Sequence, residues 1–309
     1  MSRLLVASLG FALAVASASA QTVDPELPRT PSGHPDFSGY WNSQGLTTIE
    51  RGVPGPLVVD SKDADAVARR TYDFLRSPQR GAAQDPNAFV ADVQHLANVG
   101  GEWRSSIITT PQDGKLPLTA EGRRRFEAAA AGIETTKALG PEQRDDFERC
   151  IAGTGRTPLS LVPANNFREI VQTRDHVVIY SDEGGDIRRI KLNGAPLPRE
   201  VTSKYGDSIG RWEGDELVVT TNNLLPFASN FPWGSVVIGE NSRVVERFRL
   251  IAPDELLYRY TVEDPTLYSQ PWSAEFSMRR SASESYEFAC HEANYSIVNI
   301  LQAARIKDH

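Results

Sequence analysis

From Leu159 onward, the chain consists of short segments rich in β-branched and aromatic residues, and this pattern constrains the fold more than any other feature. Tight-turn sequences separate the segments at regular intervals, among them Arg174-Asp175, Glu213-Gly214-Asp215 and Pro253-Asp254. Such a pattern is typical of β-strands joined by hairpins. The predicted strands are Phe167–Thr173, His176–Ser181, Ile187–Leu192, Ser208–Trp212, Glu216–Asn222, Ser242–Leu250, Glu255–Val262, Trp272–Arg279 and Tyr286–Cys290.

Strands that follow one another through short turns predict an antiparallel meander. A meander of about nine strands can close into a barrel, and closure removes the exposed edges that an open meander presents. We therefore predict a mainly β fold built on a lipocalin-like (calycin-type) barrel, with a β-sandwich as the alternative. Apolar residues at helical spacing in Ser296–Arg305 predict a C-terminal helix that docks on the barrel.

The N-terminal half of the chain is predicted to be an extended strap with short helices. Between Gln21 and about Pro56, frequent prolines and glycines disfavour long helices and central strands. Three helices are predicted. They are Asp60–Leu75, a helix that begins after Thr119 as its N-cap and runs to Ala130, and Glu142–Cys150. The predicted organisation is a targeting segment at 1–20, the strap and helices at 21–158 packed on the barrel, and the barrel with its C-terminal helix at 159–309.

The first twenty residues have the pattern of a signal peptide. Arg3 precedes the apolar run Leu4–Ala16, and Ala18-Ser19-Ala20 matches the small-x-small pattern that a signal peptidase cleaves. A membrane anchor is the alternative, but the apolar run is shorter than the ~20 residues that a transmembrane helix needs. The sequence therefore predicts export, with cleavage before Gln21, to the periplasm or the cell exterior.

Two cysteines, Cys150 and Cys290, lie far apart in the chain. An exported protein meets oxidising conditions, and an even number of cysteines favours pairing there. We predict a disulfide bond between them, which would add ~3–5 kcal/mol to stability on the chain-entropy model. Two separate buried thiols are the alternative.

Charge and motifs exclude several classes of function. The 33 basic and 40 acidic residues give a net charge of −7, which disfavours nucleic acids and acidic lipid surfaces as partners. The sequence contains no Gly-x-Ser-x-Gly, no P-loop and no dinucleotide-binding fingerprint. Its five histidines are scattered without metal-ligand spacing. We therefore expect neither a metal nor another cofactor.

Four motifs follow one another along the chain. The first is Thr30-Pro31-Ser32-Gly33-His34-Pro35-Asp36-Phe37-Ser38-Gly39-Tyr40-Trp41-Asn42. The second runs from Ser105-Ser106-Ile107-Ile108 through Pro111 and Asp113-Gly114-Lys115 to Leu116-Pro117-Leu118-Thr119. The third and fourth are Gly210-Arg211-Trp212-Glu213-Gly214-Asp215-Glu216-Leu217-Val218-Val219 and Tyr286-Glu287-Phe288-Ala289-Cys290-His291-Glu292-Ala293-Asn294-Tyr295. Together they resemble a large family of exported bacterial proteins of unassigned function, and the resemblance spans nearly the whole mature chain. It implies no particular activity. One departure is that Asp182 and Gly185 stand where members of that family place Glu and His.

The densest group of functional side chains is Cys290-His291-Glu292-Ala293-Asn294. A disulfide at Cys290 would hold this segment rigidly, as a catalytic group requires. His291 titrates near neutral pH and is a candidate general base or acid, with Glu292 or Asn294 orienting its ring. The alternative is that His291 has no chemical role and that Glu292 only caps the following helix.

A second group surrounds one predicted hairpin turn and comprises Asp182, Asp186 and Arg188. An arginine that points into a barrel needs a carboxylate or an anionic substrate as partner, and a surface salt bridge is the ordinary alternative. Four further residues are candidates for contacts with a ligand, two at the end of a predicted strand and two with an indole ring. For the two tryptophans, packing in the core is the alternative. The four residues are Thr221, Asn222, Trp212 and Trp272.

These features predict an exported, cofactor-independent enzyme that binds a small organic molecule in a barrel cavity. His291, with Glu292 or Asp182, would move protons in a lyase or isomerase reaction beside a carbonyl, and a hydrolase is a further alternative. Arg188 and Asp186 would contact the substrate. The rival hypothesis is a periplasmic carrier that uses the same cavity without catalysis.

Overall fold

A computed structural model describes residues 26–52, 54–75, 94–132, 140–141, 144, 149–151, 155–162, 166–229, 236–284, 289–292 and 294–307. The predicted signal peptide and most of the predicted helix Glu142–Cys150 lie outside these residues. The same is true of Tyr286–Phe288 in the last predicted strand.

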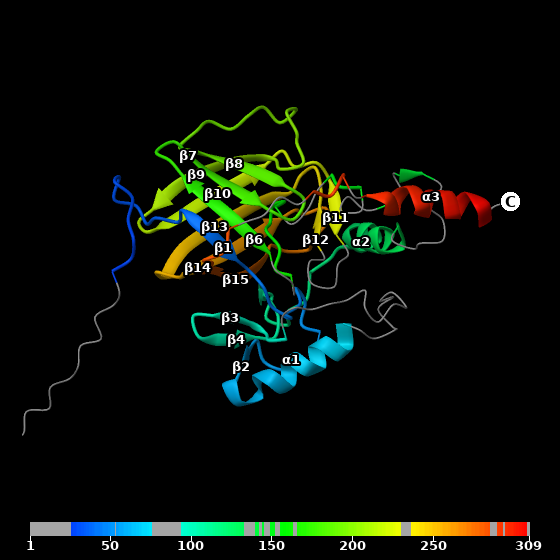
Figure 1. The fold of residues 1–309 in the computed structure, drawn as a ribbon, viewed down its shortest axis with the longest axis horizontal. Helices are drawn as coiled ribbons and strands as arrows, with labels where there is room; N and C mark the ends of the chain where they lie inside the picture. The colour runs from blue at the N-terminus through cyan, green and yellow to red at the C-terminus, as the bar shows by residue number, and fades with distance from the viewer. Residues whose placement is uncertain are drawn as a thin grey trace, which may run out of the picture.

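Within the described part of the chain, nine strands close into a barrel, as the sequence predicted (Figure 1). The hydrogen-bonded order is β1-β6-β7-β8-β9-β10-β13-β14-β15, and β15 pairs with β1 to complete the circle. The strands are β1 Gly39–Asn42, β6 Phe167–Gln172, β7 His176–Ser181, β8 Asp186–Leu192, β9 Asp207–Glu213, β10 Glu216–Asn222, β13 Arg243–Ala252, β14 Glu255–Glu263 and β15 Trp272–Arg280. The short strand β5, Ile108–Thr110, pairs with β15 outside this circle.

The strand that closes the barrel comes from the N-terminal strap. β1 pairs with β6 on one side and with β15 on the other, so the expectation that this stretch supplies no central strand is wrong. The reason is that Gly39-Tyr40-Trp41-Asn42 contains no proline and that Trp41 is fully buried between half-buried neighbours. Ala289 and Cys290, at the end of the last predicted strand, are not in a strand.

One pair of strands departs from the predicted meander. β8 and β9 run parallel, and they pair over Ile190–Leu192 and Ser208–Gly210 alone. A closed ring with an odd number of strands cannot be antiparallel throughout, because alternating directions return to the start only in an even ring. The connection 193–206 therefore crosses over between β8 and β9, although Asn193-Gly194 has the composition of a tight turn.

Two of the three helices predicted in the N-terminal half are confirmed. The described residues of the third, Arg144, Arg149 and Cys150, lie in bends and turns and not in a helix. α1 spans Ser61–Leu75 and packs with a small three-stranded sheet below the barrel in Figure 1, formed by β2 Val58–Val59, β4 Glu102–Arg104 and β3 Ala97–Val99. α2 spans Ala120–Gly132, and Thr119 Oγ1 accepts a hydrogen bond from Gly122 N at 3.0 Å as its N-cap. The antiparallel strands β11 Phe227–Ser229 and β12 Val236–Ile238 lie at the same end of the molecule as α2.

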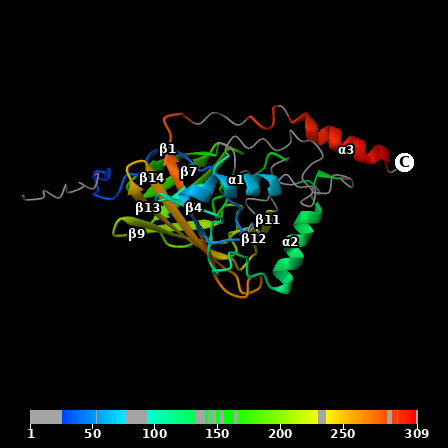
Figure 2. The same cartoon turned by 90° about the horizontal axis from the view of Figure 1, so that it is seen from below.

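The C-terminal helix α3, Tyr295–Lys307, forms as predicted but does not lie along the barrel wall. Figures 1 and 2 both show it projecting beyond the end of the barrel, on the side of α2. Ala304 is buried, whereas Tyr295, Val298 and Ile306 are exposed. The predicted apolar stripe is the covered face of α3, since Ile297, Ile300 and Leu301 are half-buried beside Ala304, although the helix itself lies beyond the end of the barrel.

Apolar side chains fill much of the barrel. β13 and β14 direct alternate residues inward, and Tyr258 of β14 packs against Phe248, Tyr260 and Phe276 at ring-centroid distances of 5.0, 5.5 and 5.1 Å. The segment 155–162 also enters this core. Leu159 and Leu161 are buried, and Leu159 N donates a hydrogen bond to Tyr258 Oη at 2.9 Å.

Candidate functional site

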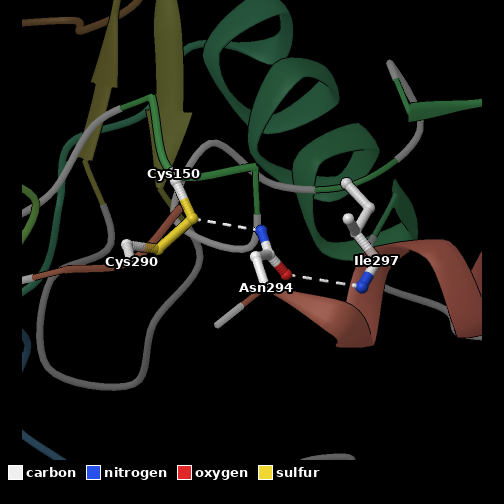
Figure 3. The surroundings of a disulfide bond; sticks show 4 residues. All are labelled: Cys150, Cys290, Asn294 and Ile297. Carbon is white, nitrogen blue, oxygen red and sulfur yellow. Dashed lines mark hydrogen bonds between the residues drawn. A yellow bond between two sulfur atoms is a disulfide. The ribbon is translucent and has the colours of Figure 1, made fainter. Parts of the chain in front are cut away.

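The predicted disulfide bond joins Cys150 to Cys290, with a Cα–Cα distance of 5.7 Å and a sequence separation of 140 residues. Figure 3 shows that Asn294 connects this bond to α3. Its Nδ2 donates to Cys150 Sγ at 3.1 Å, and its Oδ1 accepts from Ile297 N at 3.4 Å. Asn294 is therefore an N-cap of α3. Its predicted role in orienting the His291 ring stays a prediction.

His291 and Glu292 lie in the turn between the disulfide bond and α3, and both are exposed. The backbone of this turn is held by a hydrogen bond from Asn294 N to His291 O at 3.4 Å. The turn lies beside the disulfide, outside the barrel interior. The general-base role of His291 stays a prediction.

Arg188 does point into the barrel, where it forms a buried ion pair with Glu246 of β13. The exposed fractions of the two side chains are 1% and 0%, so the alternative of a surface salt bridge is wrong. Arg188 Nη1 donates to Glu246 Oε1 at 2.7 Å, and Nη2 donates to Glu246 Oε2. Burial alone would lower the pKa of Arg188, but the charge and hydrogen bonds of Glu246 outweigh burial and raise it.

Hydroxyl groups complete this buried network. Arg188 Nε and Nη2 donate to Ser208 Oγ at 3.2 and 3.1 Å, and Nη2 also donates to Thr221 Oγ1 at 2.9 Å. Tyr258 Oη donates to Glu246 Oε1 at 2.8 Å. All three guanidinium nitrogens of Arg188 and both carboxylate oxygens of Glu246 thus have partners, which is what a buried ion pair needs to be tolerated.

Asp186, at the start of β8, belongs to a second cluster in the barrel wall. It is fully buried, and its Oδ1 accepts a hydrogen bond from Tyr205 Oη at 2.5 Å. Lys204 Nζ lies 3.7 Å from the same oxygen, and Gly155 N donates to Oδ2 at 3.0 Å. Burial, followed by the hydrogen bond and the charge of Asp186, raises the pKa of Tyr205, so the phenol keeps its proton at neutral pH.

A cleft of about 260 Å³ opens between β8, β9 and the crossover connection that joins them. It lies beside the first part of β8, which is not paired with β9, because the parallel pairing begins only at Ile190 and Ser208. Tyr205 lies in the wall of the cleft, and Arg188 of the buried network also contributes to the lining. Its other polar lining residues are Arg189, Lys191, Ser203, Asp207 and Ser208.

The remaining predicted residues occupy separate positions. Asp182 is half-buried in the β7–β8 turn, and burial raises its pKa. Asn222 ends β10, whereas Trp272 is fully buried and packs edge-on against Tyr260 in the core. Trp212 stacks on His34 with centroids 4.5 Å apart. Among the described residues, Arg188 is therefore the one predicted site residue that lines the cleft, and Thr221 contacts it. Asp186 reaches the cleft only through Tyr205.

Comparisons with known proteins find no match to any protein-family model or to any curated protein. Among the described residues, no group of three or more His, Cys, Asp or Glu side chains is placed to hold a metal ion. No helix in the described ranges is both long and apolar enough to cross a membrane.

Sequence reasoning missed Glu246, Tyr258 and Tyr205. A signal for Glu246 was available, because it interrupts the apolar inward row of Val244, Phe248 and Leu250 on β13. A charged residue in such a row requires a buried partner, and Arg188 in the inward row of β8 supplies the opposite charge. Tyr205 carries no comparable signal, since it lies in the irregular crossover connection.

Proposed function

We propose that this protein is an exported, cofactor-independent enzyme that moves protons on a small polar organic molecule, as a lyase or isomerase, in the β8–β9 cleft. The observation that carries the proposal is the Tyr205–Asp186 hydrogen bond at the edge of this cleft. It joins a protonated phenol, half-exposed to the cleft, to a fully buried carboxylate. Such pairs of titratable groups in unlike environments are typical of acid–base sites.

The direction of the hydrogen bond suggests a proton relay. Tyr205 Oη donates to Asp186, so a lone pair of the phenolic oxygen is free to accept a proton from a bound substrate. As the substrate proton moves to Tyr205, the phenolic proton moves to Asp186, and no phenolate accumulates. A relay of this kind accommodates the raised pKa of Tyr205, which disfavours a free phenolate.

The size of the cleft limits the substrate. Pockets for drug-sized ligands measure ~300–1,000 Å³, so a cleft of about 260 Å³ suits a smaller molecule. The barrel centre is a poorer candidate, because the Arg188–Glu246 pair and the segment 155–162 occupy it.

Solvent deuterium exchange tests the proposal. The wild-type protein is incubated in D₂O with a panel of small carbonyl compounds, and ¹H NMR follows loss of the proton beside the carbonyl. We expect exchange of at least one compound, reduced at least ~10²-fold by Tyr205→Phe, since a general base contributes ~10²–10⁴ to the rate. Tyr295→Phe, on the exposed face of α3, is the matched control and should exchange normally.

A carrier protein is the second candidate, and the saturation of the buried network favours it. Arg188 and Ser208 reach the cleft with their hydrogen bonds already satisfied, as in a preformed binding pocket. Binding of a panel compound without any exchange would support the carrier and contradict the enzyme. Equal exchange rates for the wild type and Tyr205→Phe would show that the Tyr205–Asp186 relay takes no part in the proton transfer.

Export rests on the signal-peptide pattern and on the disulfide bond, which is favoured in oxidising compartments. A fusion of residues 1–25 to a reporter enzyme that is active only outside the cytoplasm tests it. We expect activity for the natural segment and none when Leu9 and Leu13 are both replaced by Arg, because charges interrupt the apolar run.

A further inference from the structure

We infer that the molecule bound in the β8–β9 cleft is an organic acid: a carboxylate attached to a small apolar group. The inference rests on the proposed function for the position of the site and adds the chemical class of the ligand. Two independent features of the lining carry it, an excess of positive charge and exposed apolar side chains that flank that charge.

The excess of positive charge comes from the outward face of β8. Arg188, Arg189, Lys191 and Asp207 are the charged residues of the lining. Glu246 neutralises Arg188, and Asp207 lies 3.4 Å from Lys191 Nζ. Arg189 is exposed and forms no ion pair within the described part of the chain, so one cation of the lining is uncompensated. This is a local exception in a protein whose net charge is −7.

Lys191 provides a second donor beside Arg189. The two residues share the outward face of β8, two positions apart, which places them ~7 Å from each other along the strand. The Lys191 ammonium group has three donors, and Ala195 O at 3.2 Å and Asp207 Oδ1 at 3.4 Å engage two of them. A carboxylate between these residues can therefore accept from the guanidinium of Arg189 and from Lys191.

The apolar features are Ile187 and Leu197, which also line the cleft. Ile187 precedes Arg189 on the outward face of β8 and is 60% exposed, whereas Leu197 on the crossover connection is 44% exposed. Exposed apolar side chains inside a concave site favour a ligand that covers them. A ligand with both a carboxylate and a hydrocarbon group matches this lining, whereas a sugar or an inorganic anion matches one half of it.

Three probes separate the two features. Phenylacetate carries both the charge and the apolar group, phenylacetamide lacks the charge, and gluconate lacks the apolar group. Binding is measured by NMR titration of the isotope-labelled wild-type protein. We expect phenylacetate to bind about threefold to fivefold more tightly than either of the others, as is usual for one exposed charged contact or a partly buried ring.

Variants assign each preference to its residues. Arg189→Gln should remove the preference for phenylacetate over phenylacetamide, and Ile187→Ser should remove the preference over gluconate. The matched controls are Arg174→Gln and Val171→Ser, which alter an exposed cation and an exposed apolar residue outside the cleft and should change neither preference. Higher salt should weaken phenylacetate binding and leave phenylacetamide binding unchanged.

Each outcome decides the inference. Equal binding of the acid and its amide, an effect of Arg174→Gln as large as that of Arg189→Gln, or no binding of any probe at ~10 mM, a weak-affinity limit, would overturn it. A failure of the proposed function looks different: the carboxylate preference is then present, but no acid in the panel exchanges deuterium. Exchange confined to neutral compounds would support the proposed function and overturn the inference.

Discussion

Arg188 and Glu246 show how this chain keeps two charges inside a barrel. Removing an ion pair from water is unfavourable, and the Coulomb attraction compensates only when hydrogen bonds satisfy the remaining polar atoms. Ser208, Thr221 and Tyr258 provide those bonds from three different strands. The pair therefore specifies how β8, β9, β10, β13 and β14 are arranged relative to one another.

The coupling between Arg188 and Glu246 is expected to be large. Arg188→Met leaves the buried Glu246 carboxylate uncompensated and should destabilise the protein by ~3–5 kcal/mol, whereas Arg188→Met combined with Glu246→Leu should cost less than the sum of the single variants. Urea denaturation of all four proteins measures the coupling. The control is the exposed Arg243–Glu263 pair at 3.0 Å, for which we expect a coupling below ~1 kcal/mol. Similar coupling free energies at both sites would show that burial does not strengthen the Arg188–Glu246 interaction.

Asp182 should make stability depend on pH. Burial raises the pKa of its carboxyl above the ordinary 3.8, so the folded state binds this proton more tightly than the unfolded state. Its contribution to stability is therefore present below the ordinary pKa and is lost as pH rises through the raised value. Asp182→Asn removes the buried charge and keeps an oxygen to accept the Glu183 N hydrogen bond of 2.7 Å.

We expect Asp182→Asn to melt above the wild type at pH 7 and to lose that advantage near pH 3. Thermal unfolding across this range measures the difference, with the exposed Asp175→Asn as control. A constant difference at every pH would mean that the carboxyl titrates normally.

At the scale of single elements, the eight barrel strands from β6 to β15 were predictable to within one or two residues of each end. Their alternation of buried and exposed residues and their turns are local properties of the sequence. β1 was not predictable in this way, because a four-residue strand among prolines forms only when β6 and β15 are available to pair with it. The same limit applies to the crossover connection, whose course depends on closure of the whole ring.

The candidate site follows the same division between local and long-range information. Arg188 could be predicted as an inward residue from its strand face. Its partner Glu246 lies 58 positions away, and Tyr205 meets Asp186 across the crossover connection. The cleft itself lies beside the part of β8 that precedes its parallel pairing with β9, and no local pattern encodes where that pairing begins.

The disulfide bond should stabilise the connection between α3 and the rest of the molecule. It closes a loop of 140 residues, so Cys150→Ser with Cys290→Ser should reduce the free energy of unfolding by ~3–5 kcal/mol. Because Asn294 contacts Cys150 Sγ and caps α3, helix content should also fall slightly. Chemical denaturation and far-UV circular dichroism measure the two effects. Asn294→Ala, which keeps the bond, separates the cap from the cross-link, and an unchanged unfolding free energy in the double serine variant would contradict the prediction.

At the scale of the whole molecule, closure of the barrel depends on one N-terminal strand that meets two partners from the C-terminal half. β1 covers the free edge of β6 and the free edge of β15 at once. Arg280 of β15 reinforces this seam, since its guanidinium lies 4.4 Å from the ring centroid of Trp41 and donates to Ser38 O at 2.8 Å. Without β1, two strands would present unpaired backbone groups to solvent, and an open edge of this kind is a template for aggregation.

A chain shortened to begin at Ser43 is therefore expected to lose the barrel seam and to aggregate. The matched control begins at Pro35, which keeps β1 but removes the Arg29–Asp215 ion pair and the stacking of His34 on Trp212. Both contacts lie at the surface or are half-exposed, so the control should keep the oligomeric state of the chain that begins at Gln21 and should melt within a few degrees of it. Size-exclusion chromatography and thermal unfolding compare the two chains. If the chain that begins at Ser43 is as soluble and as stable as the control, β15 and β6 must pair directly, and the barrel then closes with eight strands. β6 and β15 both run antiparallel to β1, so they would pair in parallel, and the eight-strand ring would still require the parallel β8–β9 pair. Ligand binding retained in such a shortened chain would then show that the β8–β9 cleft does not depend on closure at β1.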